Sequence, residues 1–339
     1  MPSVVEDPPG AGEAVTYIDA ISRALREEMR RDPTVYLLGQ DIAEYGGAFK
    51  VTKGFVEEFG EGRVINTPIA ESGTIGMAVG TALLGRRPVV EMQFADFISC
   101  GFNQVVNVAA KMHWRTGRPV PLVIRCPAGG GGGAGAFHSQ SMEAWFLHVP
   151  GLKVVVPAWP SDAYGLLKAA IRDPNPVLFF EHKYLYRRAK ERFPAPREDG
   201  DGLVPIGSAR VLREGTHVSV IAYGWMVHRA LEAAEAAAGE GISTEVVDLR
   251  SLSPLDEETL LASARKTGKV LILHEAPLTG GFGGELAARV ADKAFEHLDA
   301  PVRRLAYADT PVPYNKSLEA ASLPSTEGIL EAIRDLKRW

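Results

Sequence analysis

Two cysteines, Cys100 and Cys126, are all that the 339 residues contain, and they form neither a CxxC pair nor a metal-ligand cluster. This excludes a disulfide framework and favours a reducing compartment. The sequence also lacks an apolar run near the roughly 20 residues that a membrane-spanning helix needs. A net charge of −5 gives no basic surface for nucleic acid. We therefore expect a protein with neither a membrane nor a nucleic-acid partner.

The first residues, "MPSVVEDPPGAGEA", have neither the basic nor the apolar segment of a secretory signal peptide. We predict a flexible tail over residues 1–14 and a cytoplasmic location. Hydrophobic residues make up 46% of the chain, which is enough for a sizeable core. A chain of this length exceeds what one hydrophobic core usually serves, so two domains are expected.

Short apolar runs alternate with helical patterns in the first half of the chain. After Ser161, the apolar residues recur at the spacing of one helix face. Strands that alternate with helices predict an α/β fold with a mostly parallel sheet. The runs predicted as strands are 34–38, 88–94, 121–126, 152–156 and 176–181.

A charged segment rich in proline and glycine, residues 191–205, interrupts this alternation and predicts a linker. Two successive parallel-sheet α/β domains are therefore expected, over 15–190 and 206–339. In the second, Ser253-Pro254 is predicted to open a helix. The elements predicted there are strands at 217–223, 242–249, 269–275 and 302–307, and helices at 226–239, 255–267 and 283–298.

The most unusual stretch is "PAGGGGGAGAFHSQS", residues 127–141. It formally satisfies G-x-G-x-x-G, but no helix begins there and no acidic residue follows at about 20 positions, so dinucleotide binding is rejected. Two interpretations stay open. The glycines form a flexible surface loop, or their backbone lies against a ligand or a second chain. His138 at the end of the run is a structural residue or a proton shuttle.

Glu71 stands at the start of a predicted helix that carries Gly73, Gly76 and Gly80. Each glycine costs a helix about 1 kcal/mol relative to alanine, which predicts close packing of this helix on another backbone. The carboxylate is either an exposed first-turn residue or a buried acid–base group.

"DGDG" at 199–202 begins like the Gly-Asp-Gly motif that binds diphosphate and magnesium in thiamine enzymes. That motif ends in an asparagine two or three dozen residues later. This chain has none between Asn175 and Asn315, so the segment is assigned to the linker.

Several segments, in order, resemble one family over nearly the whole chain from Thr16 onward. They are "NTPIAESG", "EMQFADF", "HSQSMEAWFLHVPGLKVVVP", "VVDLRSLSPLD" and "DTPVPY". The family is that of the beta subunits of the thiamine-diphosphate-dependent, decarboxylating first component of 2-oxo acid dehydrogenase complexes. The resemblance implies a transketolase-like pyrimidine-binding domain followed by a transketolase C-terminal-like domain.

The resemblance also implies partners and cofactors. Two such chains pair with two alpha subunits, which hold Mg2+ and the diphosphate of thiamine diphosphate, while the beta chain holds the aminopyrimidine. Glu71 matches the carboxylate on the ring nitrogen, and Ile69, Gln93 and Phe97 match the pyrimidine pocket. His138 matches a histidine of the active-site funnel.

A further match, "AIRDPNP", resembles a loop that binds K+ through backbone oxygens. The corresponding positions are Leu122, Ala170, Ile171, Asp173 and Asn175, although such a sequence is also an ordinary turn. One position departs from the family, because Gln40 stands where relatives carry an acidic residue.

The family's activity is oxidative decarboxylation of a 2-oxo acid and transfer of the acyl group to a lipoyl protein. The expected partner is the lipoyl acyltransferase core, through its subunit-binding domain. The substrate stays open between pyruvate, branched-chain 2-oxo acids and acetoin. A non-catalytic docking scaffold is an alternative, motivated by Gln40.

Overall fold

The computed structural model describes residues 14–192 and 202–339, which form two compact units. We call them the N-terminal unit, which runs to Ala128 and resumes over Trp145–Ile206, and the C-terminal unit, Gly129–Ala144 with Gly207–Trp339. Residues 1–13 of the predicted tail and 193–201 of the predicted linker lie outside the described ranges. In these compact units, the glycine-rich segment groups with the C-terminal half of the chain.

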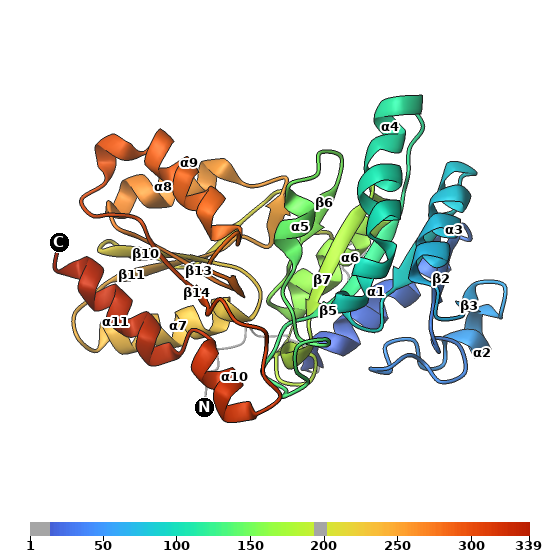
Figure 1. The fold of residues 1–339 in the computed structure, drawn as a ribbon, viewed down its shortest axis with the longest axis horizontal. Coiled ribbons are helices and arrows are strands. Elements are labelled where there is room, and N and C mark those ends of the chain that lie inside the picture. Colours follow the sequence, from blue (N-terminus) through green and yellow to red (C-terminus); the bar gives the residue numbers. More distant parts are fainter. Residues whose placement is uncertain (1–13, 193–201) are drawn as a thin grey trace. The chain divides into compact units, whose positions relative to one another are not determined.

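A parallel sheet forms the centre of the N-terminal unit, with its strands in the order β6-β7-β5-β4-β2-β3 (Figure 1). Most of their residues are buried, as expected for β-branched and aromatic runs covered on both faces. From β2 the chain first adds β3 on one side and then β4 on the other, so the direction in which successive strands are added reverses between β2 and β4. The strands are β2 (Val35–Gly39), β3 (Val64–Asn66), β4 (Arg87–Glu91), β5 (Val123–Ala128), β6 (Lys153–Val155) and β7 (Val177–His182).

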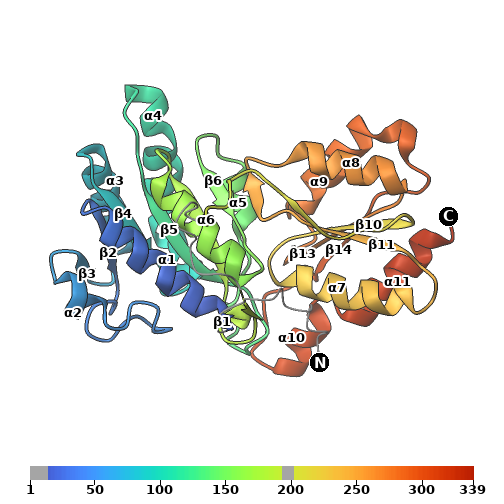
Figure 2. The same ribbon diagram turned by 180° about the vertical axis from the view of Figure 1, so that it is seen from behind.

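Two helices, α1 (Tyr17–Arg31) and α6 (Pro160–Arg172), cover one face of this sheet, and α3 (Glu71–Leu83) and α4 (Ala110–Thr116) lie on the other (Figures 1 and 2). The helix predicted after Ser161 begins with Pro160, whose fixed φ suits the first helical position. The remaining short elements are β1 (Val15–Thr16), α2 (Phe55–Phe59), η1 (Ala95–Gly101), η2 (Gln104–Ala109), α5 (Glu143–Leu147), η3 (Lys183–Leu185) and β8 (Lys190–Glu191).

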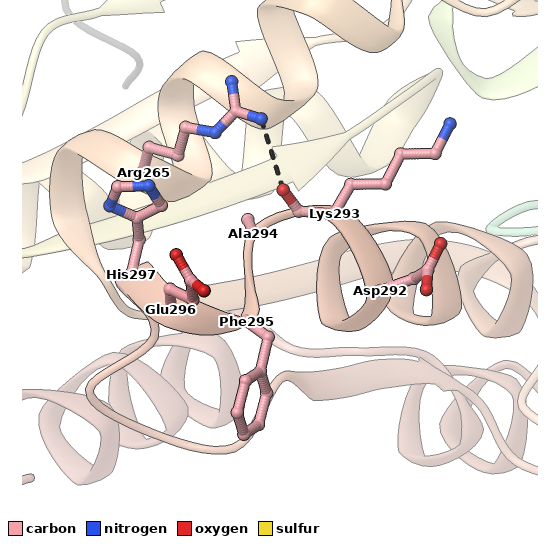
Figure 3. Close-up of a pocket in the computed structure, with 7 residues that line it drawn as sticks. All are labelled: Arg265, Asp292, Lys293, Ala294, Phe295, Glu296 and His297. Atoms are coloured by element: carbon pink, nitrogen blue, oxygen red, sulfur yellow. Dashed lines mark hydrogen bonds between the residues drawn. The ribbon is translucent and has the colours of Figure 1, made fainter.

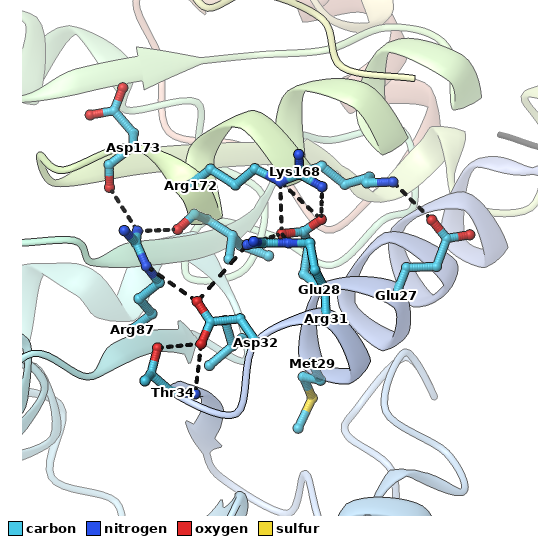
Figure 4. A network of polar contacts seen from close by, with 12 residues as sticks. Glu27, Glu28, Met29, Arg31, Asp32, Thr34, Arg87, Lys168, Arg172 and Asp173 are labelled. Carbon is cyan, nitrogen blue, oxygen red and sulfur yellow. Dashed lines mark hydrogen bonds and ion pairs between the residues drawn. The ribbon is translucent and has the colours of Figure 1, made fainter. Parts of the chain in front are cut away.

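A charge network joins α1 to α6 (Figure 4). The carboxylate of Glu28 is fully buried and accepts hydrogen bonds from Arg172 Nη2 at 2.7 Å and Arg31 Nε at 2.9 Å. Lys168 Nζ lies 2.9 Å from Glu27 Oε2. A buried carboxylate is tolerated when it is paired in this way, so the network fixes how the two helices pack.

The C-terminal unit has its own sheet, in the order β14-β13-β10-β11-β9, and the winding reverses between β10 and β13. Helices α7 and α11 cover one face, and α8 and α9 the other (Figures 1 and 2). The bounds are β9 (Arg210–Arg213), β10 (Val218–Ala222), α7 (Trp225–Ala238), β11 (Thr244–Asp248), β12 (Ser251–Ser253), α8 (Glu257–Thr267), β13 (Val270–Pro277), α9 (Gly283–Lys293), η4 (Phe295–His297), β14 (Arg303–Tyr307), α10 (Lys316–Ser322) and α11 (Thr326–Lys337).

Two predictions about this unit need correction. The helix predicted from Ser253-Pro254 begins at Glu257, because the carboxylate of Asp256 caps it by accepting the Thr259 N–H at 3.0 Å. The helix predicted over 283–298 ends at Lys293 and is followed by a separate 3₁₀ turn. Strand β9, antiparallel to β11, was not predicted because it lies at an edge and carries no apolar run.

Candidate functional site at the carboxyl edge of the N-terminal sheet

Glu71 occupies the first turn of α3, directly after the loop that leaves β3. Its side chain is 9% exposed, so the interpretation as an exposed first-turn residue is wrong for this chain. The Nε2 group of Gln40 donates a hydrogen bond to Glu71 Oε1 at 3.1 Å. Gln40 follows the last residue of β2. The position that departs from the family is therefore the direct partner of the predicted catalytic carboxylate.

The other predicted pocket residues come from the same edge. Ile69 precedes α3 and is 83% exposed, while Gln93 and Phe97 follow β4 and are half-buried. The ring of Phe97 meets that of Phe94 edge to face, with centroids 5.9 Å apart. In open α/β sheets, ligands bind outside the carboxyl ends of the strands where the winding reverses. The reversal between β2 and β4 lies at this edge, so the fold brings these residues to a ligand-binding position.

The three glycines of α3 do not pack against the backbone of any residue in the described ranges outside α3. A Cβ added at Gly76 or Gly80 would meet nothing within 4 Å, and one at Gly73 only Ala70 of the same turn. The close approach is made by Gly101 of η1, where a Cβ would lie 2.5 Å from Ile75 Cδ1. The described part of the chain therefore leaves the glycine face of α3 uncovered.

A buried charge cluster at the ends of β4, β5 and β7 was not predicted. Arg125 Nε lies 2.6 Å from Glu181 Oε1, and its Nη1 pairs with Glu91. Burial raises the pKa of Glu91, with the neighbouring Glu181 adding to the effect. Tyr186 donates to Glu181 at 2.7 Å. The signal for this cluster was present in the sequence as single charges inside apolar strand runs.

The glycine-rich loop follows β5 and packs against carboxylates of the C-terminal unit. The N–H of Gly130 donates to Glu275 Oε1 at 2.6 Å. The N–H groups of Gly131 and Gly133 donate to the two oxygens of Glu319 at 2.8 and 2.9 Å. The backbone of the glycine run therefore lies against carboxylates of the same chain, a contact that neither interpretation named. A contact of the same run with a ligand or a second chain stays a prediction.

His138 lies in the last turn of this loop and is half-buried. Its backbone N–H donates to the Gly135 carbonyl at 3.2 Å. The neighbouring Phe137 is 67% exposed, so His138 is the more buried of the two residues. His138 and Glu71 belong to different units.

Two family models match the chain. "Transketolase, pyrimidine binding domain" matches residues 13–189, and "Transketolase, C-terminal domain" matches residues 207–329. The chain is 48% identical to the 2-oxoisovalerate dehydrogenase subunit beta of Bacillus subtilis, over 96% of this chain and 99% of that protein. It belongs to the family of 2-oxo acid dehydrogenase E1 component beta subunits.

Other relatives agree with this assignment. The chain is 45% identical to a mitochondrial pyruvate dehydrogenase E1 component subunit beta-2 of Oryza sativa, over 96% of this chain and 86% of that protein. A solved structure described as an inactive beta4 tetramer of a split-gene transketolase superposes with a TM-score of 0.76 at 25% identity, over 96% of this chain and 98% of that one. The fold predicted from the sequence, two successive transketolase-like α/β domains, is confirmed.

In this E1 beta chain, the turn predicted to bind potassium already contains a protein cation. Arg87 Nη1 donates to the carbonyls of Ile171 at 2.7 Å and Asp173 at 3.3 Å. Figure 4 shows Arg87 beside Asp173. The Leu122 carbonyl accepts the Val177 N–H, and that of Ala170 accepts the Asp173 N–H. Asn175 donates to the Asp173 carboxylate. Across residues 14–192 and 202–339, no three His, Cys, Asp or Glu side chains gather as metal ligands.

A surface pocket of the C-terminal unit is lined by Arg265 and residues 292–297, where α9 passes into η4 (Figure 3). Arg265 Nη2 donates to the Lys293 carbonyl across it at 3.2 Å. None of the predicted site residues of this E1 beta chain lies there. Within the described ranges, no helix combines the length and hydrophobicity needed to cross a membrane.

Proposed function

We propose that this chain, together with an alpha subunit, catalyses the thiamine-diphosphate-dependent oxidative decarboxylation of a 2-oxo acid and transfers the acyl group to a lipoyl protein. The observation that carries the proposal is the Glu71 carboxyl at the winding reversal of the pyrimidine-binding domain. One of its oxygens accepts a hydrogen bond from Gln40. The relatives' names as dehydrogenase E1 beta subunits support it.

The residues present fit the aminopyrimidine part of the cofactor. A largely buried carboxyl is suited to a hydrogen bond with a ring nitrogen, and Ile69, Gln93 and Phe97 offer apolar and amide groups at the same edge. Thiamine diphosphate would supply the electron sink for the departing carbon dioxide, while the protein provides placement and proton control. The diphosphate and Mg2+ would be held by the alpha subunit, since this chain lacks the complete motif.

His138 would transfer a proton or donate a hydrogen bond around the substrate and the lipoyl sulfur. General acid–base groups typically contribute about 10²–10⁴-fold to the rate. The assembly would be an alpha2–beta2 heterotetramer. Its C-terminal domain would dock the subunit-binding domain of the lipoyl acyltransferase core.

The test of Glu71 is a Glu71→Gln variant purified with its alpha partner. The amide keeps the shape but cannot hold or release a proton, so carbon dioxide release should fall at least about 100-fold while the complex still assembles. Glu57→Gln, an exposed carboxylate on α2, is the matched control and should keep full activity. Near-normal turnover in Glu71→Gln would contradict the proposed role.

A substrate panel on the same complex separates the remaining alternatives. Pyruvate, branched-chain 2-oxo acids such as 2-oxoisovalerate, and acetoin are the compounds to compare by kcat/KM. Relatives of both the pyruvate and 2-oxoisovalerate type stand at similar identity, so the ranking has to come from measurement. Absence of turnover with every compound would favour the docking scaffold.

A structural K+ at Leu122, Ala170, Ile171, Asp173 and Asn175 is a separate part of the proposal. Each carbonyl oxygen has two lone pairs, so the Arg87 hydrogen bonds leave one lone pair on Ile171 and on Asp173 for an ion. Exchange of KCl for NaCl should then lower the melting temperature of the complex. An unchanged melting temperature would contradict the K+ site.

A further inference from the structure

The C-terminal sheet also has a winding reversal, between β10 and β13. In open α/β sheets this crevice, outside the carboxyl ends of the strands, is where ligands bind. In this unit, residues 129–144 contact the crevice. Tyr223, directly after β10, donates to the Glu143 carboxylate at 2.7 Å, and Glu275 of β13 accepts the Gly130 N–H. The glycine-rich segment occupies the position of a ligand.

The contacts with Glu319 have the geometry of an anion-binding site. Glu319 is 2% exposed, and its carboxylate accepts one N–H on each oxygen, from Gly131 and Gly133. Positive φ values at Gly131 and Gly133, +85° and +73°, alternate with an ordinary one between them. Such an alternation turns successive N–H groups to one side and forms a concave site for an anion. Glu319 is the anion that this loop encloses.

The loop's composition follows from this enclosure. A Cβ at Gly130 would lie 2.7 Å from Glu319 Oε1, and a Cβ at Gly135 would overlap the ring of Tyr314. Side chains at these positions would therefore push the loop away from the carboxylates. The loop is also closed at its base, where the Gly129 N–H donates to the Gln140 carbonyl at 3.3 Å. His138 lies between this closure and the glycine run.

We propose that Glu319 and Glu275 are positioning residues that hold the His138 segment in its reactive conformation, so that the C-terminal domain takes part in the reaction. This inference rests on the proposed function of His138. The two carboxylates do not touch the reacting atoms. They act by limiting where the imidazole can be, and misplacement by about 1 Å can cost about 10²-fold in rate.

The test uses the alpha–beta complex with three variants, His138→Asn, Glu319→Ala and the double substitution. Glu319→Ala is expected to lower kcat about 10²-fold, and the double variant to be no slower than His138→Asn, because both act on one group. Glu331→Ala, an exposed carboxylate on α11 of the same unit, is the control and keeps full turnover. Losses that multiply in the double variant would overturn the proposal.

Amide hydrogen exchange gives a readout that does not depend on turnover. In Glu319→Ala, the amides of residues 129–141 should exchange at least 10-fold faster than in the wild type, while helix α11 stays protected. Glu319→Gln keeps one acceptor oxygen, so its exchange rates should lie between those of the wild type and of Glu319→Ala. This variant replaces Glu319→Ala if the alanine variant does not fold. Unchanged exchange in both variants would overturn the proposal. If the wild-type complex turns over no 2-oxo acid, the proposed function fails, and faster exchange would still show that Glu319 holds the loop.

Discussion

Gln40 illustrates how one residue sets the chemistry of another. A neutral amide donates its N–H to the Glu71 carboxylate at 3.1 Å, whereas an acidic residue at the same place would repel a charged Glu71 or share its proton. The departure from the family pattern therefore gives Glu71 a neutral hydrogen-bond donor as its partner. The substrate panel, and not this contact, decides between catalysis and the docking-scaffold alternative that Gln40 motivates.

His274 carries a prediction about pH. Its ring is fully buried, donates its Nδ1–H to the Ala276 carbonyl at 3.1 Å, and stacks on Tyr223. Burial lowers the pKa of His274 to about 4, and the positive charge of Arg304 adds to the effect. The unfolded chain, with a pKa near 6.5, thus binds the proton more readily. The histidine's contribution to stability is complete above pH 6.5 and is lost as the pH falls through about 4.

Urea unfolding at pH 7.5 and pH 5 measures this contribution. From the two pKa values, the wild-type chain should lose about 2 kcal/mol of unfolding free energy over this range through His274. Asparagine does not titrate between pH 7.5 and pH 5. A His274→Asn variant should therefore lose about 2 kcal/mol less unfolding free energy than the wild type over this range. Equal pH slopes in the two proteins would show that His274 is not the responsible group.

At the scale of elements, the glycine-rich loop shows that neighbouring glycines are not equivalent. Gly135 has a φ of +77° and would place a Cβ inside the ring of Tyr314, whereas a Cβ at Gly132 meets nothing within 4 Å. Gly135→Ala should destabilise the chain by about 1–3 kcal/mol, and Gly132→Ala should change stability by less than about 0.5 kcal/mol. Chemical denaturation of both variants distinguishes them. Equal effects would contradict the packing described here.

The elements themselves were largely predictable, because their signals are local. The predicted strands match β2, β4, β5, β6 and β7 and later β10, β11, β13 and β14 to within a few residues. Helices α1 and α11 were not predicted, although apolar residues such as Ile18, Ile21 and Leu25 recur at helical spacing in α1. The described residues of this chain supply no backbone contact to the α3 glycines, so their packing on another chain stays a prediction, since spacing alone does not say which neighbour comes close.

For the whole molecule, the proposal makes this chain half of an active site. The chain lacks the asparagine that would complete a diphosphate motif, so thiamine diphosphate with Mg2+ should raise the melting temperature of the alpha–beta complex but not of the isolated beta chain. Differential scanning fluorimetry with and without the alpha partner checks this expectation. A comparable shift in the isolated chain would contradict the shared site.

The sequence by itself determined the alternation of strands and helices, because periodicity is written in neighbouring residues. The resemblance of its short motifs to one family indicated the two transketolase-like domains and the candidate carboxylate Glu71. Only the tertiary structure decided which groups meet. Gln40 reaches Glu71, Arg125 joins Glu91 to Glu181, and Glu319 binds Gly131. These partners are separated by 31 to 188 positions, and what brings them together is the order in which the strands pair, which no local pattern encodes.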